Sequence, residues 1–242
     1  MRYTISARGK ANEVPILAFL ARNFSTVPIA EIDSVFGFVE HTKLYGGRVF
    51  TRPELTPYDV NEMYYANIGV RLPLTNHYVS AEEYDETKPL LEKYHREGNA
   101  AIVTNDNLAE WIRRDFPRYR IEASVIKNLN SYARVSSALA LYDTIVLPME
   151  LNGETEFLSG LPWKDRITLF ANAGCALTCP SKICYVSISK YNKTGSGEFK
   201  CSQPLKQRDM LGMIDFDLAP LQALGFHRFK LLRSRPGGQT GY

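Results

Sequence analysis

Cysteine is absent from the first 174 of the 242 residues, and long hydrophobic runs are absent from the whole chain. No apolar run approaches the roughly 20 residues that a helix needs to cross a bilayer, which predicts no membrane span. The first 15 residues also lack the apolar core of a secretory signal. We therefore expect a cytoplasmic protein.

An excess of charge of one sign is also missing. The 29 Lys and Arg residues are balanced by 26 Asp and Glu residues, which gives a net charge of +3. A dedicated nucleic-acid binder usually has a denser basic stripe. With 45% hydrophobic residues, the composition is that of a globular protein and excludes disordered, collagen-like and coiled-coil proteins.

Short apolar runs alternate with longer amphipathic segments, and we expect the apolar runs to form eight strands. Strands that alternate with helices are typical of parallel βαβ units, and eight of them match a (β/α)₈ TIM barrel of the α/β class. A doubly wound open sheet is the alternative, but no Gly-x-Gly-x-x-Gly follows the first strand. The expected strands are Tyr3–Ser6, Ile29–Gly37, Gly69–Thr75, Ala100–Thr104, Arg120–Ser124, Thr144–Pro148, Ile167–Ala171 and Phe226–Leu232.

The helices between these strands are less regular. Ser80–Arg96 has the clearest pattern, because Ser80 and Glu83 form a capping-box motif and Gly98 follows the end. We predict a single TIM-barrel-like domain over residues 1–242, in which some helices are reduced or missing. A cysteine-rich metal-binding insertion is expected at residues 172–210. The other predicted helices are Glu13–Phe24, Leu108–Arg114 and Tyr132–Leu141.

Polar residues follow the predicted strands at the end where barrel enzymes carry their active sites. Glu150 follows the sixth strand, where it could form a salt bridge or act as a working carboxylate, and Asn172 follows the seventh. Lys230 lies within the eighth strand and Arg233 just after it. An ammonium group inside a barrel strand is unusual unless the side chain turns to solvent, so Lys230 is a candidate site residue.

All four cysteines fall between Cys175 and Cys201, in a Cys-x₃-Cys-x₄-Cys-x₁₆-Cys pattern that also includes Cys179 and Cys184. Four thiolates favour an iron–sulfur cluster or zinc. Structural zinc sites usually have one near and one far pair of cysteines, whereas three cysteines are bunched here, which favours the iron–sulfur cluster. Zinc remains the alternative, and some of the cysteines could simply be buried apolar residues.

The cysteine region resembles the signature of the collagenase-like peptidases, peptidase family U thirty-two. The resemblance rests on Cys184–Ser189, on Phe199–Pro204, on Glu150 within Leu147–Leu151, and on Phe229–Arg233. It implies a barrel-like fold and a [4Fe–4S] cluster held by Cys175, Cys179, Cys184 and Cys201. Members are implicated in oxygen-independent hydroxylation of ubiquinone precursors and of tRNA uridine, and some are described as proteases.

The resemblance therefore implies an iron–sulfur enzyme that hydroxylates a small aromatic or quinone precursor, or RNA. Its substrate would lie near Glu150, Asn172, Lys230 and Arg233. The alternatives are a metal-stapled binding or accessory subunit and a protease-like hydrolase. The chain has neither Gly-x-Ser-x-Gly nor His-Glu-x-x-His.

Two kinds of partner are expected. Family members can work as pairs, which implies a partner subunit or a homo-oligomer. RNA contact is a further hypothesis, because basic side chains are interleaved with aromatic rings in and after the cysteine region. These residues are Lys190, Lys193, Lys200, Lys206 and Arg208, with Tyr185 and Tyr191.

Overall fold

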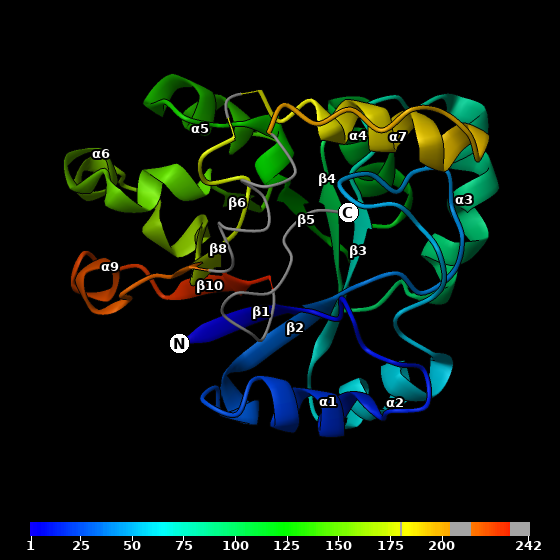
Figure 1. Cartoon of the computed structure of the whole chain (residues 1–242), viewed down its shortest axis with the longest axis horizontal. Helices are drawn as coiled ribbons and strands as arrows, with labels where there is room; N and C mark the ends of the chain where they lie inside the picture. The colour runs from blue at the N-terminus through cyan, green and yellow to red at the C-terminus, as the bar shows by residue number, and fades with distance from the viewer. Residues whose placement is uncertain (180, 204–213, 233–242) are drawn as a thin grey trace.

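The computed structural model describes residues 1–179, 181–203 and 214–232, and its centre is a closed barrel of eight parallel strands (Figure 1). The strand order around the barrel is β1-β10-β7-β6-β5-β4-β3-β2. Tyr3 on β1 lies beside Phe229 on β10, and this pairing of the first and last strands closes the barrel. The barrel strands are β1 (Arg2–Ser6), β2 (Ile32–Phe36), β3 (Gly69–Leu74), β4 (Ala100–Val103), β5 (Arg120–Ala123), β6 (Thr144–Val146), β7 (Ile167–Phe170) and β10 (Arg228–Leu231).

The predicted α/β TIM-barrel class is confirmed, and each of the eight predicted strands corresponds to a barrel strand. The second strand begins later than predicted, because the 3₁₀ turn Ile29–Glu31 precedes Ile32. The strands could be recognised as short apolar runs because strands of a closed parallel barrel are buried on both faces. β3 and β4, for example, are buried along their whole length.

Helices of unequal length connect the strands. The capping box predicted for Ser80 and Glu83 is present at the start of α3. α6 and α9 are only six and five residues long, in keeping with the expected shortened helices. The helices are α1 (Ile16–Asn23), α2 (Pro57–Tyr65), α3 (Ala81–Lys93), α4 (Asp106–Asp115), α5 (Tyr132–Ala138), α6 (Thr155–Gly160), α7 (Cys184–Thr194) and α9 (Ala219–Ala223).

The connection from β7 to β10 carries more structure than a loop. β8 (Asn172–Ala173) pairs with β9 (Ile214–Asp215) outside the barrel, and α7 follows β8 along the chain. Cys184, expected in a cysteine-rich loop, is the first residue of α7. The predicted insertion at 172–210 therefore includes an eleven-residue helix, while its residues 180 and 204–210 lie outside the described residues.

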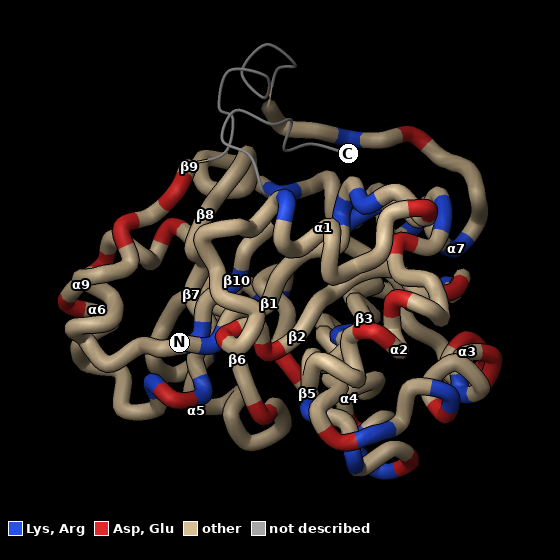
Figure 2. The backbone as a smooth tube through the Cα atoms, turned by 90° about the horizontal axis from the view of Figure 1, so that it is seen from below, with Lys and Arg blue, Asp and Glu red and all other residues tan. Residues whose placement is uncertain are grey.

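Among the described residues, no helix is long and apolar enough to cross a membrane. Basic and acidic positions are interspersed around the described backbone (Figure 2), as the balanced charge predicts.

Candidate functional site

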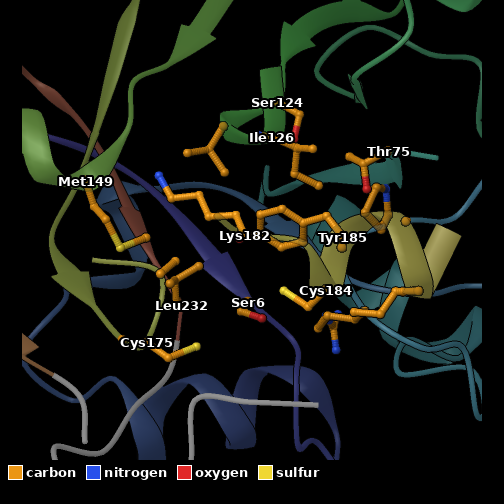
Figure 3. Close-up of a pocket in the computed structure, with 18 of the residues that line it drawn as sticks. Ser6, Thr75, Ser124, Ile126, Met149, Cys175, Lys182, Cys184, Tyr185 and Leu232 are labelled. Carbon is orange, nitrogen blue, oxygen red and sulfur yellow. Dashed lines mark hydrogen bonds between the residues drawn. The ribbon is translucent and has the colours of Figure 1, made fainter. Parts of the chain in front are cut away.

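A cavity of about 200 Å³ lies at the carboxyl ends of the barrel strands (Figure 3). We call it the mouth cavity. Each barrel strand contributes to its wall either directly or through a residue within three positions of its end, so the cavity depends on the whole barrel being closed. These wall residues are Ser6, Phe36, Pro73, Ile102, Ser124, Met149, Phe170 and Lys230.

All four cysteines line the mouth cavity. Each carries a thiol and none is in a disulfide. Cys175 and Cys179 lie in the segment after β8, Cys184 begins α7, and Cys201 follows that helix. Figure 3 shows Cys175 and Cys184 reaching the cavity from different segments, Cys184 from α7. The structure thus brings together side chains that the sequence could only group by spacing.

Hydrogen bonds connect the cysteine-bearing segments to one another. The thiol of Cys179 lies 3.2 Å from the Ser202 hydroxyl and accepts the Lys182 amide proton at 3.3 Å. The amide of Gln203 donates to Cys201 Sγ at 3.4 Å, and its side-chain Nε2 donates to the Cys175 carbonyl at 3.2 Å. Residues 201–203 therefore connect the two segments that carry Cys175 and Cys179.

The surroundings of Cys179 favour its thiolate. Burial alone would raise the pKa of this thiol, but hydrogen bonds from Ser202 and Lys182 and the charge of Lys182 outweigh burial and lower it. Thiolate is the form that binds metals.

These residues match the donor chemistry of an iron–sulfur or zinc site. Four soft thiols share one cavity, and amide hydrogen bonds to two of the sulfurs are of the kind that tune iron–sulfur clusters. In the described part of the chain, however, no three Cys, His, Asp or Glu side chains are grouped closely enough to hold one metal ion. The four sulfurs thus face a common space without converging on one point.

Lys230 lies in the wall of the mouth cavity and is buried. Its Nζ donates to Glu122 Oε1 at 3.2 Å and lies 4.5 Å from the centre of the Phe36 ring. Burial lowers the pKa of this ammonium, and the charge of Glu122 opposes that effect. The side chain therefore points into the barrel and not to solvent.

Glu122 belongs to a buried network of charged side chains whose members are far apart in the sequence and could not be grouped from it. Arg71 donates to Glu122 and, at 2.8 Å, to Asp33. Burial alone would raise the pKa of Glu122, but Arg71 and Lys230 outweigh it and lower that pKa. Arg71 could have been found by the argument used for Lys230, because it interrupts an otherwise apolar barrel strand.

Glu150 and Asn172 lie beside the cavity but are not part of its lining. The Glu150 carboxylate accepts a hydrogen bond from Lys182 Nζ at 2.7 Å, and Lys182 does line the cavity. Asn172 is buried and accepts the Leu232 amide proton at 2.9 Å, which joins β8 to the end of β10. Arg233 lies outside the described residues.

The residues predicted to contact RNA have varied surroundings. Lys193 Nζ pairs with Glu83 at 2.8 Å, and Lys190 lies over the Tyr78 ring. The Tyr191 ring packs on Phe199, with centroids 4.7 Å apart, whereas Tyr185 lines the mouth cavity. The Lys200 amide donates to Ser187, and Lys206 and Arg208 lie outside the described residues.

Comparison with known proteins gives a structural match. No protein-family model and no curated protein matches the chain. A solved structure described as "The Structure of the U32 Peptidase Mk0906" is similar, with a TM-score of 0.67 and 14% identity over 98% of this chain and 94% of the other. At this identity the match establishes the fold, and the barrel implied by the resemblance to family U thirty-two is confirmed.

Proposed function

We propose that this chain is an iron–sulfur enzyme, related to the family U thirty-two hydroxylases, that hydroxylates a small aromatic or quinone-like molecule in the mouth cavity. One observation carries the proposal: four thiols from separate positions line a cavity at the carboxyl ends of the barrel strands. The fold shared with a U32 peptidase structure adds support.

The proposed cluster ligands are Cys175, Cys179, Cys184 and Cys201. A bound cluster would supply electron transfer next to the substrate. Hydroxylation with water as the oxygen source converts R–H and H₂O into R–OH, two protons and two electrons. The reaction therefore also needs a separate electron acceptor.

The chain's own residues would bind and orient the substrate. Phe36, Ile102, Met149 and Phe170 present apolar side chains that would pack against the faces of a ring. Lys230 Nζ, held by Glu122, would donate a hydrogen bond to a carbonyl or phenol oxygen. Apolar cavities of about 150 Å³ bind benzene, so a cavity of about 200 Å³ suits a single ring.

The size and lining of the cavity favour this substrate class over RNA. A nucleotide of an RNA chain is larger than a single ring, and Lys193, one of the expected RNA contacts, is paired with Glu83. RNA contact therefore remains the less supported hypothesis, as does a partner subunit.

A hydrolytic function is less well supported by the same cavity. Among the described residues that line it there is no His, Asp or Glu to act as general base for a cysteine or serine nucleophile. In the accessory alternative, zinc holds the cysteine segments together and the chain has no catalytic activity. The metal bound, zinc or iron, therefore distinguishes this alternative from the proposal.

Metal analysis of anaerobically purified protein tests the proposal. We expect broad visible absorbance, with about four irons and four sulfides per chain. Cys179→Ser and Cys184→Ser should each lower iron content severalfold, because each removes one cluster ligand. Ser181→Ala, in the same segment but without a proposed ligand role, is the matched control and should retain iron.

A colourless protein with one zinc per chain would support the accessory function instead. Absence of both metals after anaerobic reconstitution with iron and sulfide would contradict the proposal.

A further inference from the structure

Of the Lys, Arg, Asp and Glu residues in the described part of the chain, only basic ones line the mouth cavity. They are Arg8, Arg48, Lys182 and Lys230. Lys182 and Lys230 are each paired with an acid outside the lining, Glu150 and Glu122 respectively. An apolar cavity with several cations and no acid in its wall is suited to an anionic ligand.

Arg8 and Arg48 also line a second cavity, of about 300 Å³, between the segments that follow β1 and β2. The wall of this second cavity also includes Arg52 and one acidic residue, Glu54. Arg8 and Arg48 therefore lie between the mouth cavity and the second cavity.

The guanidinium of Arg48 is held in a defined plane. Both of its terminal nitrogens donate to the Glu54 carboxylate, and it lies over the Phe38 ring at 4.5 Å from the centroid. Glu54 is fixed in turn by the Phe38 amide, which donates to it at 3.1 Å. A guanidinium has five N–H donors, so this pairing leaves others for a ligand.

The backbone before Arg48 is built to approach the barrel closely. A Cβ on Gly46 would lie 2.3 Å from the Thr75 carbonyl oxygen, so only glycine fits there. Gly47 has a φ of +73°, in the left-handed region that favours glycine. These two glycines bring Arg48 to the cavity wall.

We propose that the ligand of this site carries an oxyanion, a carboxylate or a phosphate, that binds to Arg8 and Arg48 while its ring occupies the mouth cavity. The identification of this ligand as the enzyme's substrate rests on the proposed function. A guanidinium binds both oxyanions with two parallel hydrogen bonds, which fixes orientation as well as charge. The ring would extend from the arginines toward Lys230 and the cysteines.

Calorimetric titration with four probes tests the proposal: phenyl phosphate, benzoate, benzyl alcohol and inorganic phosphate. We expect phenyl phosphate or benzoate to bind at least tenfold more tightly than benzyl alcohol, which lacks the charge, and than inorganic phosphate, which lacks the ring.

Arg8→Gln and the double variant Arg48→Gln/Glu54→Gln should each weaken binding of the charged ring compounds about tenfold or more. The double variant removes the ion pair as a unit, so no uncompensated Glu54 carboxylate is left behind. Arg8→Lys should recover only part of the affinity, because lysine cannot bind bidentately. Arg22→Gln, an exposed arginine on α1, is the matched control and should bind as the wild type does.

Unchanged binding in both arginine variants would overturn the proposal, as would equal binding of benzyl alcohol. Equal binding of inorganic phosphate would overturn the part that places the ring in the mouth cavity. Iron and sulfide measured in the same samples separate this result from the proposed function. A protein without iron that binds phenyl phosphate through Arg8 and Arg48 would retain the oxyanion site and lose the cluster.

Discussion

At the scale of single residues, the charges inside the barrel are what distinguish this chain from a purely apolar core. Arg71 connects Asp33 and Glu122, and Glu122 connects in turn to Lys230 at the cavity wall. Removing one member of such a set leaves another charge buried without its partner, which is costly in a medium of low polarity. The network therefore holds the Lys230 ammonium in place in the wall of the mouth cavity.

Asp33→Asn should reveal the network through its pH dependence. Burial alone would raise the pKa of Asp33, but Arg71, Arg120 and Arg228 outweigh it and lower that pKa. A lowered folded-state pKa adds stability that is fully present above the unfolded-state pKa of about 3.9 and is lost as pH falls through the folded value. We expect wild type to exceed the variant by about 1–3 kcal/mol in unfolding free energy at pH 7.

The measurement is urea unfolding of both proteins at a series of pH values from neutral to acidic. The difference should shrink as pH falls below the unfolded-state pKa. Asp215→Asn, an exposed aspartate on β9, is the control and should change stability by less than about 0.5 kcal/mol throughout. A difference between wild type and Asp33→Asn that does not vary with pH would rule out the role assigned to the charge.

At the scale of elements, the sequence predicted best those helices and strands whose defining contacts or pattern lie within a few residues of one another. β4 is apolar over all four of its residues, β3 is buried over all six with Arg71 as its one charged residue, and the capping box of α3 lies within four residues of sequence. α7 was missed because it begins at a cysteine, Cys184, and its start has no side-chain cap, so its residues were interpreted as a metal-binding loop.

Ser80→Ala tests the local signal at α3. Ser80 accepts the Glu83 amide proton at 3.3 Å, and the Glu83 carboxylate accepts the Ser80 amide proton at 3.0 Å. Loss of the hydroxyl should lower the free energy of unfolding by about 1 kcal/mol. Ser136→Ala, an exposed serine within α5, should leave stability unchanged or slightly increased, because alanine is the better helix former. The measurement is chemical denaturation of both variants. Equal changes in the free energy of unfolding would contradict the capping role.

At the scale of the whole molecule, α7 is joined to the segments after β2 and β3 by buried amides. Asn192 Nδ2 donates to the carbonyls of Tyr45 and Arg48 at 3.0 and 2.8 Å, and its Oδ1 accepts the Phe50 amide proton at 2.9 Å. Asn76 Nδ2 donates to the Ser189 carbonyl at 2.9 Å. These contacts place Cys184, at the start of α7, over the same cavity that Arg48 lines.

Asn192→Ala should therefore disturb both sides of the mouth cavity. The substitution removes this partner from the Phe50 amide and the Arg48 carbonyl, at a cost of about 1–3 kcal/mol for each unsatisfied group. The Tyr45 carbonyl keeps its hydrogen bond from Asn76. We expect faster hydrogen exchange at residues 45–50 and along α7. Asn107→Ala, an exposed asparagine on α4, is the control. If the 45–50 segment kept wild-type protection, the coupling between it and α7 would be refuted.

The sequence by itself determined the eight strands, their alternation with helices and the grouping of the cysteines, because each of these depends on side chains that are near one another in the chain. It also marked Lys230 as a charge inside a strand. Only the tertiary structure decided that Lys230 meets Glu122 and Arg71, that α7 carries Cys184 to the barrel mouth, and that Arg8 and Arg48 join the same cavity. These contacts join residues up to 147 positions apart. They form only when the closed barrel brings the ends of its strands together, so no local pattern of residues could specify them.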